Sequence, residues 1–115
     1  NNMSTIFTKI INKEIPADIL YENDSVIAFR DVNPQAPVHF LVIPKKEIPT
    51  LNDIDENDKD IIGELFLVAK KLAKIEGLEK KGYRTIFNCN EDGGQTVFHI
   101  HLHVMGGRQM EWPPG

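Results

Sequence analysis

Three of the four histidines alternate with apolar residues in one short segment near the C-terminus. They are His99, His101 and His103, and the residues around and between them are Phe98, Ile100, Leu102 and Val104. Successive side chains of a β-strand point to opposite faces, so this spacing predicts that the apolar set enters the core and that all three imidazoles share the other face. A face that only met solvent would be expected to carry residues such as Thr, Lys or Glu, and a face in the core would be expected to carry Val. We therefore interpret the imidazole face as a candidate active site.

Two chemistries suit such a face. Histidine is a common zinc ligand, but residues at i and i+4 of a strand are anchored roughly 13 Å apart. A metal site would therefore use two of these histidines with His39, and hardly all three. The other chemistry is phosphoryl transfer, with the central imidazole as nucleophile between two supporting rings. Its second nitrogen must then donate a proton to an acceptor, for which a backbone carbonyl suffices.

Hydrophobic periodicity predicts the elements that position these residues. A short helix carries Ile6, Phe7, Ile10 and Ile11, with Ser4 or Thr5 as its cap and Pro16 as its downstream limit. Two strands, residues 19–22 and 25–31, should form a hairpin about Asn23-Asp24. Residues 33–37 contain two prolines and break the pattern before a buried strand over residues 39–43.

The second half should contain one long helix and two strands. The helix begins at Asp53 or Asp55 and stops at Gly77, and its buried face is Ile61, Ile62, Leu65, Val68, Ala69 and Leu72. The strands cover residues 83–89 and 97–105, on either side of a polar loop over residues 90–94. This order predicts an α+β domain: a five-stranded, mostly antiparallel sheet with the long helix packed on it and a short N-terminal helix.

Composition limits the classes of function. The chain has 115 residues, 41% hydrophobic and 26% charged, which predicts one globular domain over residues 4–115 with a tail from residue 106. A net charge of −4 argues against a nucleic-acid partner, and no apolar run is long enough to span a membrane. The single cysteine, Cys89, predicts a reducing compartment, the cytoplasm or the nucleus. Asn1 and Asn2 precede Met3 and are expected to be additions to the natural chain.

The segment from His99 to Met105 resembles the signature of the histidine triad (HIT) superfamily, in which three histidines alternate with apolar residues. Similarity to its Hint branch, the histidine triad nucleotide-binding proteins, extends over Thr5 to Gly115. The matching motifs are Ile6-Phe7, Lys13-Glu14-Ile15-Pro16-Ala17, Pro34-Gln35-Ala36-Pro37, His39-Phe40-Leu41-Val42-Ile43-Pro44-Lys45-Lys46, Asp92-Gly93-Gly94-Gln95 and Gly106-Gly107-Arg108-Gln109-Met110.

This resemblance implies a purine nucleoside phosphoramidase, also active on aminoacyl-adenylate-type conjugates, that works as a homodimer without a metal or other cofactor. His101 would attack the α-phosphorus and carry the nucleotide, and His103 would contact the phosphate oxygens. His99 and His39 would support and tune the nucleophile through hydrogen bonds. Adenosine and guanosine monophosphates would be the products.

The same resemblance assigns the other site residues. Asp31 would bind the ribose hydroxyls with Asn33 nearby, and Asn88 and Thr96 would contact the phosphate and the leaving group. Trp112 would reach the site of the partner subunit. The base pocket would consist of Phe7, Ile10, Ile15 and Phe29. Asn33 and Thr96 stand where many members have serine, which leaves substrate preference open.

Two other functions stay open at this point. The protein could be a nucleotide-binding regulator or scaffold whose catalysis is incidental, or a small histidine-metal protein. Presence of all four histidines together with Asn88 and Thr96 favours the enzyme, because nucleotide binding alone does not require an intact nucleophile.

Overall fold

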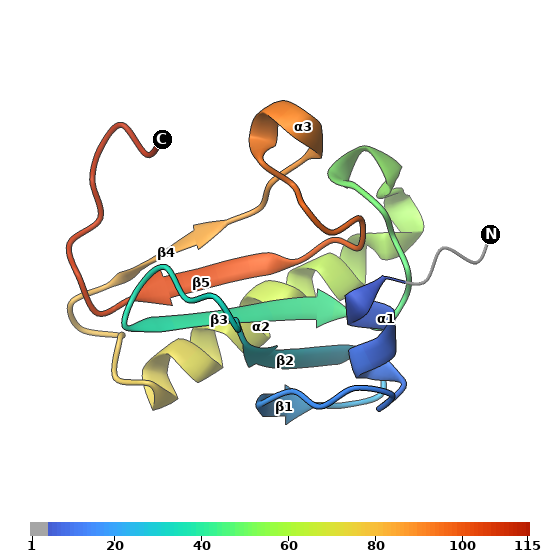
Figure 1. The fold of residues 1–115 in the computed structure, drawn as a ribbon, viewed down its shortest axis with the longest axis horizontal. Coiled ribbons are helices and arrows are strands. Elements are labelled where there is room, and N and C mark those ends of the chain that lie inside the picture. The colour runs from blue at the N-terminus through green and yellow to red at the C-terminus, as the bar shows by residue number, and fades with distance from the viewer. Residues whose placement is uncertain (1–4) are drawn as a thin grey trace.

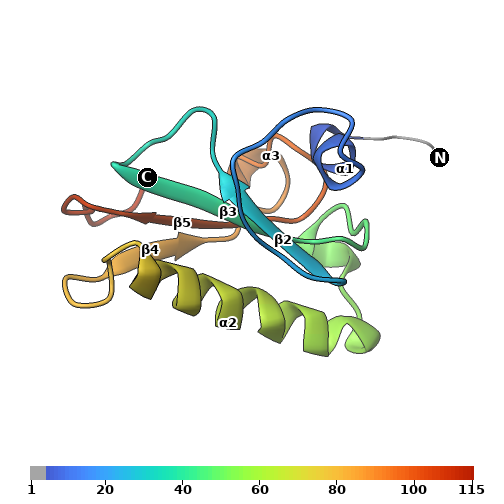
Figure 2. The same cartoon turned by 90° about the horizontal axis from the view of Figure 1, so that it is seen from below.

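The computed structural model describes residues 5–115 as a sheet with helices on both sides (Figures 1 and 2). The five strands lie in the order β1-β2-β3-β5-β4, and every neighbouring pair is antiparallel. This confirms the predicted α+β fold; the expectations for Asn1, Asn2 and Ser4 lie outside the described residues. The elements are α1 (Ile6–Ile11), β1 (Ile19–Glu22), β2 (Val26–Arg30), β3 (Val38–Pro44), α2 (Lys59–Ile75), β4 (Tyr83–Ile86), α3 (Asn90–Gly93) and β5 (Leu102–Gly106).

The short helix α1 begins at the predicted cap. The hydroxyl of Thr5 accepts hydrogen bonds from the backbone N–H groups of Phe7 and Thr8, which satisfies two amides that lack a helical partner. Phe7 and Ile10 are buried against the sheet. α1 therefore covers part of the side of the sheet that α2 does not.

The side chains of β2 divide between the two sides of the sheet, as their alternation predicts. Val26 and Ala28 pack in the core beneath α2, whereas Ile27 and Phe29 pack in the core beneath α1. The strand starts one residue later than predicted, because the side chain of Asn23 accepts the amides of Ser25 and Val26 and extends the turn. The predicted hairpin is otherwise confirmed.

The long helix α2 packs its predicted face against the sheet, and Gly77 follows its last turn with a φ of +80°. Two 3-10 turns, Leu51–Asp53 and Glu56–Asp58, precede it. The prediction that Asp53 or Asp55 caps the long helix was wrong, because α2 begins at Lys59 and has no side-chain cap. Asp55 caps the second 3-10 turn instead, and the carboxylate of Asp53 accepts the N–H and hydroxyl of Thr50, which caps the first turn. No helix within residues 5–115 is long and apolar enough to cross a membrane.

The last strand is shorter than predicted, and of the three alternating histidines only His103 lies in it. The pairing of β5 with β3 begins only at Leu102, opposite Val42, because Pro44 has no N–H to continue the ladder. The carbonyl of Pro44 accepts a hydrogen bond from the imidazole of His99 (2.7 Å) instead. The segment before β5 bends, so Phe98 is 48% exposed and the prediction that it enters the core was wrong.

β4 also ends early, at Ile86 rather than at Cys89. Its partner residue there is His103, one position after β5 begins. The loop predicted over residues 90–94 contains a single helical turn, α3, and the left-handed Gly94 (φ +82°) closes it.

Candidate active site

A cavity of about 260 Å³ opens on the α1 side of the sheet, beside the start of β5. Its walls come from α1, the loop after α1, the end of β2, the middle of β3, the segment that leads into β5, and β5 itself. They include most of the predicted site residues, namely Phe7, Ile10, Ile15, Phe29, Asp31, Thr96, His101 and His103. An apolar wall and a polar wall therefore meet at the two histidines.

His101 is held as a neutral ring with one nitrogen available. Its Nδ1 donates a hydrogen bond to the backbone carbonyl of His99 (2.8 Å), which leaves the lone pair on Nε2. The ring packs edge-on against Phe7, with the ring centres 5.0 Å apart. Burial lowers the pKa of His101, and the bond to His99 and the charge of Asp31 oppose this shift. The result is the tautomer that a nitrogen nucleophile requires.

His99 supports this arrangement mainly through its backbone. Its carbonyl accepts the His101 proton, while its own imidazole donates to Pro44 and is 1% exposed. Nδ1 of His99 is buried and has no hydrogen-bond partner among the described residues. Burial lowers the pKa of His99 as well. The hydrogen bond expected between His99 and the candidate nucleophile is made by the main-chain carbonyl of His99.

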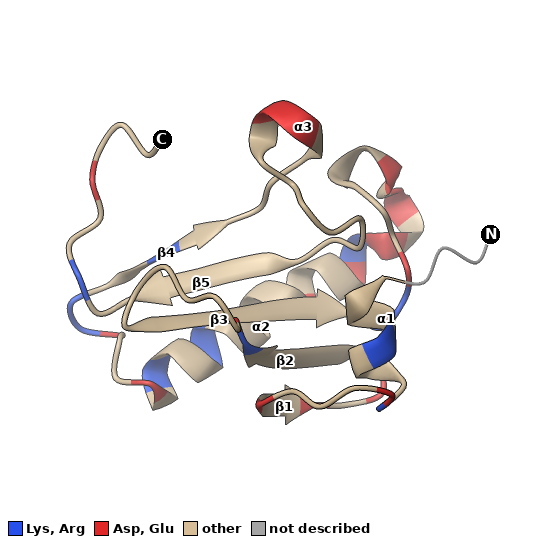
Figure 3. Ribbon diagram, in the orientation of Figure 1, with Lys and Arg blue, Asp and Glu red and all other residues tan. Residues whose placement is uncertain are grey.

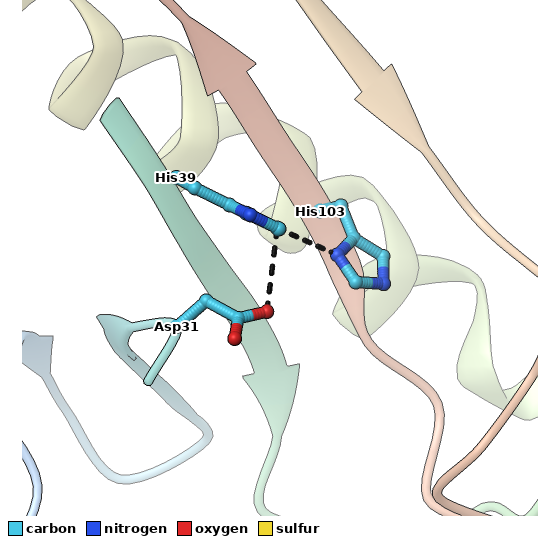
Figure 4. Close-up of side chains that lie close together, drawn as sticks. All are labelled: Asp31, His39 and His103. Carbon is cyan, nitrogen blue, oxygen red and sulfur yellow. Dashed lines mark hydrogen bonds and ion pairs between the residues drawn. The ribbon is translucent and has the colours of Figure 1, made fainter. Parts of the chain in front are cut away.

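His39, His103 and Asp31 form a second hydrogen-bonded group beside His101 (Figure 4). Nε2 of His39 lies 2.9 Å from Nδ1 of His103 and 3.3 Å from Oδ2 of Asp31. The His101 and His103 rings are adjacent, with centres 4.9 Å apart. Burial, with the nearby His101 and His39, lowers the pKa of His103 to about 4. His39 therefore contacts His103 directly, and its expected support of His101 runs through that ring.

The partners of these rings determine where their protons lie. Nδ1 of His39 accepts the backbone N–H of Gln35 (3.0 Å), so neutral His39 carries its proton on Nε2. That proton faces Nδ1 of His103, which must then be an acceptor. Neutral His103 consequently carries its proton on Nε2. Of the adjacent His101 and His103 rings, His101 therefore offers a lone pair on Nε2, and His103 offers an N–H donor on Nε2.

Five predicted residues do not line the cavity: His39 and His99, described above, and three others. Asn33 is exposed and donates its N–H to Asp31 (2.8 Å), which places it beside the carboxylate. Asn88 is half-buried in the loop after β4. Trp112 is 82% exposed, and its ring lies 5.9 Å from the guanidinium of Arg84. The cavity of one chain brings none of the three to His101.

Sequence reasoning missed the groups that orient the histidines, because several belong to the main chain. The N–H of Gln35 and the carbonyl of Pro44 give no signal in the side-chain pattern. Gln95 was found only as part of a matching motif. Its buried amide accepts the Asn90 N–H and donates to the Val97 carbonyl, which holds the segment containing Thr96. Its burial within a loop, which the structure shows, is the feature that sets Gln95 apart.

Asp31, His39 and His103 are also the residues that could hold a metal ion. One ligand atom from each lies within 4.8 Å of the others. Carboxylate and imidazole are suitable ligands for zinc. Nε2 of His39 is hydrogen-bonded to Nδ1 of His103, however, and an ion among the three residues would replace this hydrogen bond. The metal reading therefore competes with the proton arrangement described above.

A family model, related sequences and solved structures all match this chain. A family model described as HIT domain matches residues 12–110. An uncharacterised HIT-like protein of Synechococcus elongatus is 55% identical over 111 residues, which is 96% of each chain. The purine nucleoside phosphoramidase of Escherichia coli is 52% identical over 106 residues, 92% of this chain and 89% of that one. The crystal structure of a HIT family hydrolase from Legionella pneumophila Philadelphia 1 matches with a TM-score of 0.95 at 53% identity, covering 97% of this chain and 100% of that one.

Proposed function

The chain belongs to the HIT family, and from this premise we propose that it hydrolyses the P–N bond of purine nucleoside 5'-phosphoramidates and of aminoacyl-adenylate-type conjugates. Relatives with hydrolase and phosphoramidase names support this class of reaction. The observation that carries the proposal is the proton of His101: Nδ1 is bonded to the His99 carbonyl, so Nε2 keeps its lone pair in a ring that lines the cavity. We expect no metal or other cofactor to be required.

The reaction has two steps. Nε2 of His101 attacks the α-phosphorus, a P–Nε2 bond forms, the P–N bond to the leaving group breaks, and the amine departs after taking up one proton. Water then attacks the phosphorus of the nucleotidyl-histidine, and the P–Nε2 bond breaks. The hydroxide of the water stays on phosphorus, and the proton that the water releases balances the one taken up by the amine. The products are nucleoside monophosphate, amine and free His101. The Nδ1 bond to His99 orients the ring throughout.

The Nε2 donor of His103 is suited to charge stabilisation. Phosphoryl transfer depends mainly on positioning and on donors aimed at the phosphate oxygens. A ring with a pKa of about 4 stays neutral near pH 7, so its donor is present without a fixed positive charge. Thr96 lines the same cavity and supplies a hydroxyl. Asn88 would contact the phosphate from the loop after β4, a role that rests on the family pattern.

The rest of the cavity suits a purine nucleoside. Phe7, Ile10, Ile15 and Phe29 offer apolar surface to the base. Asp31 is partly accessible, with its side chain 18% exposed, and its carboxylate can accept from the two ribose hydroxyls, beside Asn33. A volume of about 260 Å³ is small for a whole conjugate, so the leaving group would lie at the open end.

A homodimer would complete that open end. Trp112 is the only tryptophan of the chain and has a large amphipathic ring, yet it is 82% exposed in the single chain. We propose that it packs near the leaving-group end of the partner subunit's cavity, as the family pattern implies. The half-buried, unpaired Cys89 supports a reducing compartment, the cytoplasm or the nucleus.

A turnover assay tests the function. The protein is given a panel of adenosine and guanosine phosphoramidates, and release of nucleoside monophosphate is followed without added metal. Samples quenched without acid are then examined for nucleotide attached to His101. Turnover of at least one purine phosphoramidate is the expected result. Tight binding of nucleotide with no turnover of any conjugate would contradict the proposal and favour the regulatory or scaffold function.

A further inference from the structure

The C-terminal segment after β5 lies directly against the loop before β3. Val38 and Gly106 are paired residues at the ends of these two strands. At Gly107, whose φ is +95°, an added Cβ would come within 2.9 Å of Pro37. Glycine therefore allows the chain to turn closely around the proline loop. The next residue, Arg108, is brought over that loop.

Arg108 holds the main chain of Gln35 with two hydrogen bonds. Its Nε and Nη2 both donate to the Gln35 carbonyl, at 3.2 and 3.0 Å. Its third nitrogen, Nη1, donates to the carbonyl of Gln109 (3.2 Å). The planar guanidinium thus ties the C-terminal segment to the loop in one orientation. The loop is exposed at Gln35, where the side-chain Nε2 of Gln35 donates to the Asn33 carbonyl (3.0 Å). The main-chain carbonyl of Gln35 is held by Arg108.

Gln35 is also the residue whose N–H sets the proton of His39. That N–H donates to Nδ1 of His39, and Nε2 of His39 then donates to Nδ1 of His103. We infer that Arg108 is a positioning residue: through Gln35 and His39 it holds His103 in the tautomer that carries its proton on Nε2. The chain of contacts runs from an exposed cation to the donor in the cavity.

The inference concerns the state of His103 and rests on the proposed function only for its catalytic consequence. Loss of the guanidinium frees the Gln35 carbonyl and lets the loop rotate, so Nδ1 of His39 loses a fixed donor. His39 can then carry its proton on either nitrogen, and His103 follows it. Arg108 does not reach the cavity walls described above, and its effect is therefore indirect.

Nitrogen NMR of the histidine rings tests this directly. Protein labelled with ¹⁵N is compared at pH 7.5 without nucleotide as wild type, Arg108→Ala, Arg108→Lys and Lys81→Ala, with His103 signals assigned from a His103→Asn variant. Lys81 lines the same surface groove as Arg108, so Lys81→Ala is the matched loss of one positive charge. In wild type we expect His103 with a bare Nδ1 and a protonated Nε2.

The expected result is that Arg108→Ala moves both His103 nitrogen signals toward the average of the two tautomers. Arg108→Lys, which keeps the charge and one donor, should fall between it and wild type, and Lys81→Ala should match wild type. Unmoved His103 signals in Arg108→Ala, or an equal movement in Lys81→Ala, would overturn the inference. Both outcomes can be read whether or not the protein turns over a phosphoramidate.

Kinetics then tests the link to catalysis. On an adenosine phosphoramidate, Arg108→Ala should lower kcat by about threefold to tenfold, the scale of one weakened hydrogen bond in the transition state, and change KM by less than about twofold. Arg108→Lys should recover part of the loss. A fall in kcat without movement of the His103 signals would show a structural effect of the tail and count against the relay. Absence of turnover in wild type would refute the proposed function alone.

Discussion

The two sides of the sheet are both covered by a helix, but they differ in how much of the sheet is covered and in which side chains they bury. On the α2 side, a helix of 17 residues covers the strands, and the buried cluster beneath it is entirely apolar. On the α1 side, a helix of 6 residues covers only part of the sheet, and the uncovered part carries the cavity and the histidines. Figure 2 shows this difference in cover. The length of each helix therefore separates the stabilising side from the reactive side.

Charged residues lie on both sides of the sheet. Figure 3 shows Lys and Arg along α2 and near the chain segments around β4, acidic residues around α3 and the start of α2, and a basic residue on α1. The buried imidazoles, in contrast, lie on the α1 side, with His39, His99 and His101 all less than a tenth exposed. Burial lowers the pKa of each of them. These rings therefore remain neutral at neutral pH, and protonating them in acid lowers the stability of the folded state.

The largest expected effect comes from removing the nucleophile on the α1 side. His101→Ala should lower kcat at least about a thousandfold, because no other group supplies the covalent step. The fold should persist, since the α2 side is untouched, and affinity for nucleoside monophosphate should stay within a few-fold. Circular dichroism, binding calorimetry and the turnover assay measure these three quantities. Full activity in this variant would rule out the mechanism.

A cavity-forming change on the α2 side should do the reverse. Leu65 is fully buried, so Leu65→Ala should lower the free energy of unfolding by about 2–5 kcal/mol while the folded fraction keeps its kcat. The matched change is Ile15→Ala in the cavity wall, which is only partly buried. It should cost less stability and raise KM for purine conjugates. Urea unfolding and kinetics separate the two, and the comparison fails if both variants change KM equally.

Acid should weaken the α1 side first. Unfolded histidines bind protons below about pH 6.5, whereas native His103 resists until about pH 4, so the unfolded state binds more protons in between. The free energy of unfolding should therefore fall as pH drops from 6.5 toward 4. Each such ring contributes up to about 1.4 kcal/mol per pH unit. Urea unfolding between pH 7.5 and 5 should give a shallower slope for His103→Asn than for wild type; identical slopes would contradict the lowered pKa.

A smaller effect is expected at the open end of the α1 side. Truncation after Gln109 removes Trp112 but keeps Arg108. It should alter kcat/KM among leaving groups by roughly threefold to thirtyfold, on the scale of one lost aromatic contact, with affinity for nucleoside monophosphate nearly unchanged. Kinetics on conjugates with small and large amines measures it, and sedimentation reports the oligomeric state. A truncated dimer with an unchanged ranking of substrates would show that the tail has no role in the site.

Chelation should have the least effect of all. The donors that line the cavity are imidazoles and a hydroxyl, so exhaustive EDTA treatment should leave kcat within error of the untreated protein. Metal analysis of protein purified without added metal provides the control. Activity lost with EDTA and restored by zinc would instead assign Asp31, His39 and His103 as ligands.

Elements with a strong local pattern could be predicted from the sequence, and contacts between distant segments could not. The faces of β2 and α2 follow from apolar periodicity, and the cap at Thr5 from its residue type. The late start of β5 depends on Pro44, a residue in another strand that has no N–H to donate. The contact between His39 and His103 depends on strand register, and their tautomers depend on a main-chain N–H. Such groups leave no mark in side-chain composition.

The pairing of β3 with β5 has a consequence for how activity appears during folding. His39 and His103 touch although 64 positions separate them in the chain, and α2 and β4 lie between them. Closing such a long loop is slow compared with forming a hairpin or a helix. A chain that has formed only its β1–β2 hairpin and α2 therefore holds most of its local structure but lacks the contact between His39 and His103. Recovery of turnover during refolding should lag behind recovery of helical signal, which makes this site a late reporter of native topology.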